Sequence, residues 1–457
     1  MADTKNTILH GRIFPPLIRF AIPLMLAILL QALYGAVDLF VVGKFGDTAS
    51  VSAVSNGSQI MHTITGIITG LTMGVTVLVG HAVGAKDNDR AARTVGGAIR
   101  LFALVTVVIT TMMVIFTKEI AVFMNVPAEA MDKTVEYVRI CSAGTVFIVG
   151  FNAISGLFRG LGNSKSPLLF IGIACAVNIA ADLLLVGYFK LDAAGAAYAT
   201  IFAQAVSVVF SIFKIRHDKL PFPFCKEHIA RPEGAQLRIL ATGGPLALQD
   251  CLVSTSFLII LAIINEFGLV ASASLGIAEK LFLFLAIVPM SFMSALSAFV
   301  AQNVGAHQER RALDAMKIAM AISFVFGLAV AALSVLKGDM LASIFEDDPL
   351  VIATAAEYLR SSGLEYAVIA ITFCFLGYFN GIGKTTFVMI EGLISSFVFR
   401  IPLSFFLSRL PDTNLYIIGF AVPLSALSSL ILCIAYFFFV RSRRLRTGGS
   451  DTPLPSE

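Results

Sequence analysis

The sequence predicts an all-α integral membrane protein with twelve transmembrane helices, arranged as two tandem lobes of six helices each. The first reason is composition: 57% of the 457 residues are hydrophobic and 14% are charged, whereas soluble domains carry about 25% charged residues. The second reason is that the apolar runs are long and continuous, which favours spanning helices over the alternating pattern of a β-barrel. The third is an internal repeat.

Three sets of residues recur at a constant spacing of 221 positions. They are Val83-Gly84-Ala85 with 304–306, Glu136-Tyr137-x-Arg139 with 357–360, and Gly156, Phe158, Gly160 and Gly162 with Gly377, Phe379, Gly381 and Gly383. Near the start of the chain the spacing is 222. A shared spacing indicates a tandem duplication, and duplicated apolar halves are typical of secondary transporters.

Twelve apolar segments, six in each half, are long enough to cross a hydrocarbon core of about 30 Å. They fall at roughly 15–42, 51–80, 94–116, 135–160, 167–189, 194–214, 239–265, 271–302, 314–336, 352–382, 387–408 and 414–440. The expected organisation is an N-terminal lobe at 1–213, a cytoplasmic linker at 214–238, a C-terminal lobe at 239–440, and a basic and then disordered tail at 441–457.

The distribution of lysine and arginine predicts the orientation. With both termini in the cytoplasm, the cytoplasmic segments hold 23 of these residues and the opposite side holds 8. This asymmetry predicts a multi-pass protein of the cytoplasmic membrane (a cell inner membrane) with cytoplasmic N- and C-termini. Because each half has six spans, both halves have the same orientation and form a parallel repeat about an axis along the membrane normal.

Ionisable residues within spans cost roughly 2.5–3.5 kcal/mol each on insertion, so each needs a reason. Asp38 and Asp182 share a depth, since they lie about 9 and 12 Å from the span ends near Lys44 and Lys190 at the rise of a helix. Asn178 lies one turn before Asp182 on the same helical face. Two acids and an amide at one depth can hold a proton or a small cation. The structural alternative is that each acid is hydrogen-bonded to backbone or hydroxyl groups.

The second half of the chain does not copy this polar group. Its counterparts at the repeat spacing are apolar: Ile260, Phe399 and Leu403. A residue required for packing should more often be kept in both copies, so the difference favours a functional role.

Other ionisable residues in the spans are weaker candidates. Asp250, near the middle of the seventh span, is a candidate second coupling or substrate residue, and Glu279 and Glu365 are cavity candidates. Glu279 and Lys280 are adjacent, and we expect each to have a structural partner.

Glu391 lies close to the cytoplasmic end of its span, and Arg400 is the expected counter-charge of Glu391 or of Glu365. Acids outnumber bases among these residues, which favours a cavity for cations or protons over one for polyanions.

The sequence argues against several other chemistries. The six cysteines lie singly and the six histidines show no ligand spacing, so neither a disulfide framework nor a metal site is expected. Gly383-Lys384-Thr385 is similar to the end of a phosphate-binding loop, but Tyr378 stands where that loop requires glycine. With no Ser/His/Asp or Cys/His set, we expect no enzyme.

With these residues in place, the chain resembles the multidrug and toxic compound extrusion (MATE) family over nearly all of residues 14–440. The residues that carry the resemblance are Gln31-x-x-Tyr34-x-x-x-Asp38, Val83-Gly84-Ala85, Asn178-x-x-x-Asp182, and Gly195-Ala196-Ala197-Tyr198-Ala199-Thr200. Together, in this order and in a duplicated twelve-span frame, they are specific.

The resemblance implies two lobes in a V around a central cavity that opens alternately to either side. In that family a proton or sodium ion in the N-terminal lobe drives export of organic cations and other amphipathic drugs. The resemblance implies that Asp38, Asn178 and Asp182 form the coupling site, with Thr200 and Tyr34 as supporting ligands.

The resemblance further suggests that Gln31 and Asn152 line that lobe. Some branches of the family also use acids of the C-terminal lobe, where only Asp250 and Glu365 could serve. Whether the ion is H⁺ or Na⁺ stays open, with Na⁺ binding possible at the three polar residues of the coupling site.

The expected function is therefore multidrug efflux by antiport with H⁺ or Na⁺. The protein is expected to be a monomer that binds drug-like molecules and the bilayer, with no cofactor, nucleotide or nucleic acid. The first alternative is a flippase of the same superfamily for a lipid-linked oligosaccharide or cell-wall precursor, whose cavity should be basic to hold pyrophosphate. A membrane sensor or scaffold is the second, and has no reason to carry depth-matched acids. A membrane enzyme is the third.

Overall fold

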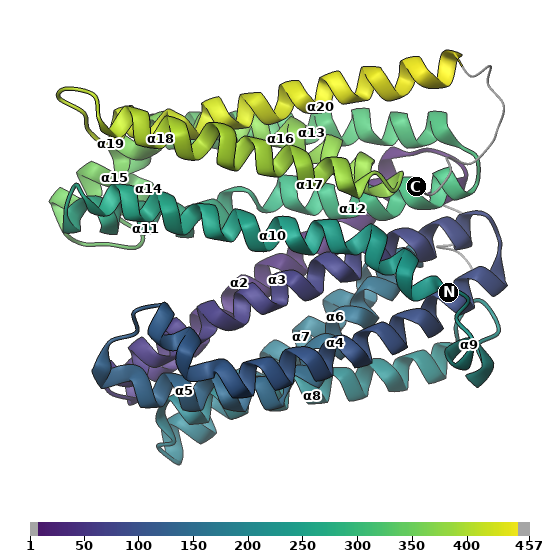
Figure 1. Cartoon of the computed structure of the whole chain (residues 1–457), viewed down its shortest axis with the longest axis horizontal. Helices are drawn as coiled ribbons and strands as arrows, with labels where there is room; N and C mark the ends of the chain where they lie inside the picture. The colour runs from purple at the N-terminus through teal and green to yellow at the C-terminus, as the bar shows by residue number, and fades with distance from the viewer. Residues whose placement is uncertain (1–7, 447–457) are drawn as a thin grey trace. The chain divides into compact units, whose positions relative to one another are not determined.

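The computed structural model describes residues 8–446 (Figure 1). Its contacts divide the chain into two compact units, with the boundary between Cys251 and Leu252. Most of the expected tail at 441–457 lies outside the described residues. The regular secondary structure of the described part is helical throughout.

Unit 1 consists of the helices before this boundary. They are α2 (Phe14–Phe45), α3 (Thr48–Gly84), α4 (Asn88–Phe123), α5 (Ala128–Ala143), α6 (Thr145–Gly160), α7 (Lys165–Asp182), the π-helix η1 (Leu183–Tyr188), α8 (Asp192–Asp218), α9 (Lys226–Ala230) and the first part of α10 (Ala235–Asn265).

Unit 2 consists of the rest of α10 and the helices that follow it. They are α11 (Leu269–Leu285), α12 (Ile287–Gly305), α13 (Glu309–Leu336), α14 (Gly338–Ala342), α15 (Pro349–Ser362), α16 (Glu365–Gly381), α17 (Thr385–Leu393), the π-helix η2 (Ile394–Arg400), α18 (Ile401–Ser408), α19 (Leu415–Gly419) and α20 (Ala421–Arg446).

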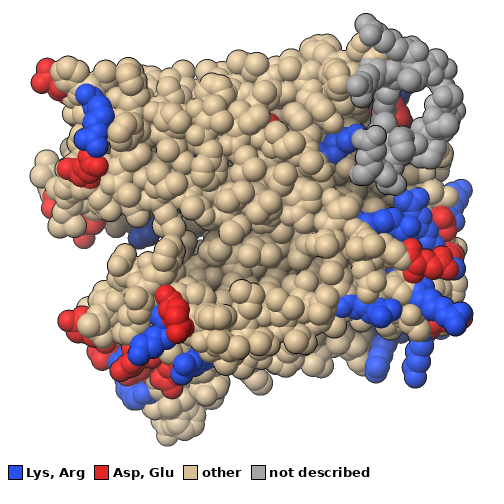
Figure 2. Space-filling model, in the orientation of Figure 1, with Lys and Arg blue, Asp and Glu red and all other residues tan. Residues whose placement is uncertain are grey.

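The helices confirm the prediction of an all-α membrane protein. Within the described residues, ten helices are long and apolar enough to cross a membrane, or up to twelve when two bent helix pairs each count as one span. On the face shown in Figure 2, charged side chains gather near the ends of the helices, and the surface between them is almost uncharged. A band of this kind fits the hydrocarbon core of a bilayer.

The two bent pairs occupy equivalent places in the repeat. α5 and α6 meet at Gly144 with a bend of 52°, and α15 and α16 meet at 363–364 with a bend of 50°. Hydrophobic runs alone did not predict these bends. Their equivalence supports the duplication in three dimensions.

The recurring glycines are explained by close helix packing. A Cβ on Gly156 would lie 2.2 Å from the side chain of Thr72, and one on Gly160 would lie 2.8 Å from the carbonyl oxygen of Thr76, so α6 lies directly against α3. In unit 2, a Cβ on Gly377 would lie 2.6 Å from the carbonyl oxygen of Met293, against α12. Glycine at these positions permits close approach of two backbones.

The first part of α10 packs against α3. A Cβ on Gly70 would lie 2.4 Å from the backbone nitrogen of Ala247, and one on Gly74 would lie 2.7 Å from the carbonyl oxygen of Ile239. This contact places the compact-unit boundary inside α10, whereas the apolar pattern predicts that the second lobe begins at residue 239. The repeat and the compact unit therefore end at different positions.

The segment between α8 and α10 also belongs to unit 1. A Cβ on Gly96 of α4 would lie 2.1 Å from the carbonyl oxygen of His228 in α9. Arg93 of α4 forms ion pairs with Asp89 and Glu233, and Arg100 donates a hydrogen bond to the carbonyl oxygen of Ala230 at 3.1 Å. The segment expected as a linker is thus docked on α4 by both packing and charge.

Candidate functional site

The polar residues predicted in unit 1 lie together between α2, α7 and α8, which pack against one another. α2 supplies Asp38, and α7 supplies Asn178 and Asp182. Their exposed fractions are 3%, 0% and 0%. Two ionisable groups and an amide are therefore removed from solvent at one place, at an energetic cost that packing does not explain.

Only one hydrogen bond of this group has regular geometry. Thr200 of α8 donates its hydroxyl to Oδ2 of Asp38 at 3.3 Å. The Asp182 carboxylate and the Asn178 amide lie within interaction distance of Asp38. Even so, Oδ1 of Asp38, both carboxylate oxygens of Asp182 and both polar atoms of the Asn178 amide have no hydrogen-bond partner among the described residues.

Tyr34 lies one turn before Asp38 on α2. Its hydroxyl is close to Thr200 and Asp38 but forms no regular hydrogen bond among the described residues. The structure therefore brings together all five residues named for the coupling site. Whether they bind an ion stays a prediction.

α5 adds two residues that the sequence pattern did not predict. Tyr137 and Cys141 are buried and lie close enough to Asp38 to interact electrostatically. The hydroxyl of Tyr137 is 3.1 Å from that of Ser58 on α3. Tyr137 belongs to a motif that recurs in both halves of the sequence. A repeated motif does not show which of its residues face a site.

A widened helical turn follows the site directly. α7 ends at Asp182, and the next six residues form the π-helix η1. Single π-turns within α-helices are often found at functional sites.

The loop end of unit 1 is held by a group of charges around Lys133 of α5. Its ammonium donates to Asp47 at 2.8 and 2.9 Å, to the Ser50 hydroxyl at 2.8 Å and to Asp192 at 3.1 Å. Asp47 also caps α3, where it accepts a hydrogen bond from the backbone of Ser50 at 2.7 Å. These hydrogen bonds, that of Lys133 first, hold the pKa of Asp47 below its ordinary value. The cluster joins α3, α5 and the start of α8, which carries Thr200.

The other candidates of unit 1 do not join the site. Gln31 is exposed, and the Asn152 amide donates to the carbonyl oxygen of Ile148 in its own helix at 2.8 Å. Asp250 is exposed and lies beside Gly66 of α3, where a Cβ would be 3.7 Å from that of Asp250. A role for these three residues in lining a cavity stays a prediction.

In unit 2, Arg400 lies near Glu365 and Glu279 and interacts electrostatically with both. Of the two counter-charge options for Arg400, the structure thus favours Glu365. Glu391 instead accepts a hydrogen bond from Ser429 of α20. Lys280 is exposed.

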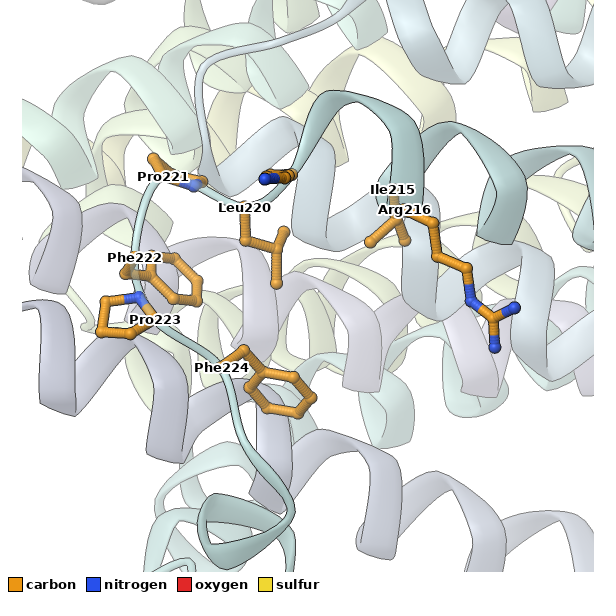
Figure 3. A pocket seen from close by; sticks show the side chains of 8 residues that line it. Ile215, Arg216, Leu220, Pro221, Phe222, Pro223 and Phe224 are labelled. Carbon is orange, nitrogen blue, oxygen red and sulfur yellow. The ribbon is translucent and has the colours of Figure 1, made fainter.

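Two further features bear on possible ligands. No group of three or more His, Cys, Asp or Glu side chains within the described ranges is arranged to hold a metal ion. An open hollow of about 560 Å³ lies at the end of α8 and in the segment that follows it. Leu220, Phe222 and Phe224 line it, and Arg216 of α8 extends at its rim (Figure 3). It contains none of the acids discussed above.

Buried carboxylates with unpartnered oxygens can hold either a proton or a hard cation. When both are ionised, neighbouring carboxylates repel each other, and one bound positive charge removes that repulsion. Carboxylate, amide and hydroxyl oxygens are also the ligands that hard cations prefer. The arrangement of Asp38, Asp182, Asn178 and Thr200 fits both.

Curated relatives of similar length match nearly the whole chain. The protein is 25% identical over 432 residues to "Probable multidrug resistance protein YoeA" of Bacillus subtilis, covering 93% of each chain. It is 26% identical over 400 residues to "Probable multidrug resistance protein NorM" of Thermotoga maritima, covering 85% of this chain and 84% of the other. It is 23% identical over 402 residues to "Multidrug export protein MepA" of Staphylococcus haemolyticus, covering 88% of each.

Solved structures share the fold at lower identity. A MOP superfamily transporter from Pyrococcus furiosus matches with a TM-score of 0.88 at 20% identity, covering 95% of this chain and 97% of the other. An outward-facing multidrug resistance MATE family transporter matches with a TM-score of 0.89 at 20% identity, covering 97% and 99%.

The MatE family model matches the chain twice, at residues 23–184 and 245–406. The two matches begin 222 positions apart, as the internal repeat requires, and together they cover more than half of the chain. The chain belongs to the MatE family, the multidrug and toxic compound extrusion transporters.

Proposed function

We propose that the protein is a secondary active exporter of organic cations and other amphipathic drugs, driven by antiport with H⁺ or Na⁺. The observation that carries this proposal is the buried group of Asp38, Asp182 and Asn178. Among the described residues, Oδ1 of Asp38, both carboxylate oxygens of Asp182 and the amide oxygen of Asn178 have no hydrogen-bond partner. The similarity to multidrug resistance and multidrug export proteins supports drug export, and the site supports ion coupling.

Asp38 and Asp182 act as the ion-binding pair in this mechanism. In the state that accepts drug, the pair is without its ion. In the state that releases drug, the pair takes up H⁺ or Na⁺ from outside, with Asn178, Thr200 and Tyr34 as supporting ligands. Coupling requires the ion to bind one state more tightly than the other, because a ligand that binds both equally shifts neither.

The carboxylates outside this pair are the proposed contacts for cationic drugs. Glu279 and Glu365 of unit 2 are the strongest of these, and Asp250, Gln31 and Asn152 are further cavity residues. We place the protein in the cytoplasmic membrane as a monomer. The distribution of lysine and arginine supports the cytoplasmic placement of both termini.

The test is efflux of ethidium from proteoliposomes under separately imposed proton and sodium gradients. We expect one of the gradients to drive efflux, and Asp38→Asn to abolish it while the protein is produced and folded normally. Asp132→Asn is the matched control, because this aspartate is exposed and lies on α5 outside the site. Undiminished gradient-driven efflux in Asp38→Asn would refute the assignment. No response of the wild type to either gradient would favour the lipid-linked precursor flippase.

A further inference from the structure

The two units carry different ionisable groups around the same repeated tyrosine. Tyr137 of unit 1 and Tyr358 of unit 2 are repeat equivalents, and both are buried. At the repeat spacings of 221 and 222, Glu365 corresponds to Gly144 and Glu279 corresponds to Gly57. Each unit is thus uncharged where the other carries its acids.

Glycine at position 57 has a structural consequence. A Cβ there would lie 2.3 Å from the ring of Tyr137, so the tyrosine fills the space that a side chain would need. In unit 2 the equivalent position carries Glu279, which is half-buried. The space beside Tyr358 therefore holds a carboxylate that unit 1 has no room for.

Arg400 completes the group in unit 2. Its guanidinium carbon lies 4.8 Å from the ring centre of Phe257, over the face of the ring. It lies close to the Tyr358 hydroxyl and interacts electrostatically with Glu279 and Glu365. In the described part of the chain, neither carboxylate comes within ion-pair distance of Arg400, and Nε of Arg400 is buried without a hydrogen-bond partner.

Glu365 is the more buried of the two acids in this group. It is 9% exposed, and no hydrogen bond to its carboxylate is found within residues 8–446. A carboxylate this buried is stabilised by a nearby positive charge. Arg400 supplies one such charge for two acids.

The charge of the cluster can be counted, because arginine is always protonated in proteins. Two ionised carboxylates and one guanidinium leave a single negative charge. One additional monovalent cation neutralises the cluster, whereas a divalent cation leaves it positive. With Arg400 absent, two negative charges would remain, which suits a divalent cation.

We propose that Phe257, Glu279, Glu365 and Arg400 form the anchor for the cationic centre of the substrate, and that Arg400 restricts it to substrates with one positive charge. This inference rests on the proposed function, since it presumes that organic cations are bound. In this view Arg400 is a specificity-determining residue, and its cation–π contact with the face of Phe257 holds the guanidinium beside the two carboxylates.

Ethidium and propidium test the inference, because they share one aromatic ring system and carry one and two positive charges. Binding of each dye to the purified full-length protein is measured by fluorescence, and transport is measured in proteoliposomes. We expect the wild type to prefer ethidium, and Arg400→Gln to shift the affinity ratio towards propidium by tenfold or more. Arg400→Lys keeps the charge and should keep the wild-type ratio.

A double substitution keeps the test decisive. Arg400→Gln combined with Glu279→Gln restores one negative charge and should restore the preference for ethidium. Arg409→Gln is the matched control, since this arginine pairs with Glu266 at 3.1 Å away from the cluster. An unchanged dye ratio in Arg400→Gln, or a ratio in the double variant equal to that of Arg400→Gln, would overturn the inference.

The outcomes also separate this inference from the proposed function. Dye binding with a shifted ratio in Arg400→Gln but without gradient-driven efflux would support the anchor and refute the antiport. If a gradient drives efflux of both dyes and the affinity ratio of ethidium to propidium is the same in the wild type and in all variants, the result would support the antiport and refute the role of Arg400.

Discussion

The hydroxyl of Thr200 donates to Asp38 at 3.3 Å, although the two residues lie 162 positions apart. This hydrogen bond joins α8 to α2 at the place where Asp38 of α2 lies close to Asp182 of α7. A hydrogen bond to a charged group contributes about 1.5–3 kcal/mol. Thr200→Val removes the hydroxyl at nearly constant volume, and we expect it to lower the initial rate of gradient-driven efflux about tenfold or more.

Thr200→Ser keeps the hydroxyl and is the control for this change. It should retain most of the efflux rate when both variants are measured in the same vesicles at equal protein content. Equal rates for the valine and serine variants would show that the hydrogen bond does not contribute to coupling.

The charges around Lys133 predict a dependence of stability on pH. The pKa of Asp47 lies below its ordinary value in the folded protein, so its contribution is present above the unfolded pKa and is lost as the pH falls through the folded one. We expect the melting temperature of the detergent-solubilised protein to decrease below about pH 4, and Lys133→Met to reduce this dependence.

Lys118→Met provides a comparison for the lysine change. Lys118 is exposed on α4, so its removal should leave the pH dependence of melting as in the wild type. If Lys133→Met and the wild type lose stability in parallel as the pH falls, the cluster is not the cause.

The contact between α3 and α10 predicts sensitivity to a single methyl group. In Gly70→Ala the new Cβ would meet the backbone of Ala247 at 2.4 Å, and backbone cannot move aside as a flexible side chain does. Overpacking of this kind costs about 1–3 kcal/mol. We expect a lower melting temperature and reduced efflux.

Gly172→Ala is the matched change at an open helical position, where nothing lies within 4 Å of an added Cβ. It should leave melting and efflux near the wild-type values. A wild-type melting temperature for Gly70→Ala would mean that α3 and α10 do not pack this closely.

Glu391 and Ser429 form a buried hydrogen-bonded pair, and substitutions can separate the contribution of the hydrogen bond to stability from the cost of an unpaired hydroxyl. Glu391→Gln retains an oxygen acceptor for the Ser429 hydroxyl and should melt near the wild type. Glu391→Ala leaves that hydroxyl unpaired in a buried position, at a cost of about 1–3 kcal/mol. Adding Ser429→Ala removes the unpaired group and should recover part of the loss, as measured by thermal melting of the three variants.

Much of the fold could be predicted from the sequence because each membrane span requires a long run of apolar residues. The bend at Gly144 could not, since hydrophobicity reports the length of a span and carries no information about its direction. The docking of α9 on Gly96 was also missed, because that contact depends on the absence of a side chain in a segment with few apolar residues.

The candidate site was partly predictable for a related reason. Asp38, Asn178 and Asp182 stood out because polar residues in spans are costly, and the structure places them together. Tyr137 carries no such cost, so its position beside them could be read only from three-dimensional packing. Asn152 stays a prediction, since the hydrogen bond that its amide donates within its own helix does not test a role in lining a cavity.

The exchange of acids for glycines between the repeats has a consequence for how the halves depend on each other. Both halves of a duplicated chain can retain the same functional residues. In the proposed mechanism neither half can replace the other, because each half carries a set of ionisable residues that its counterpart does not have. Two copies of one half, joined in place of the natural pair, would hold either the proposed coupling acids or the proposed anchor, and never both.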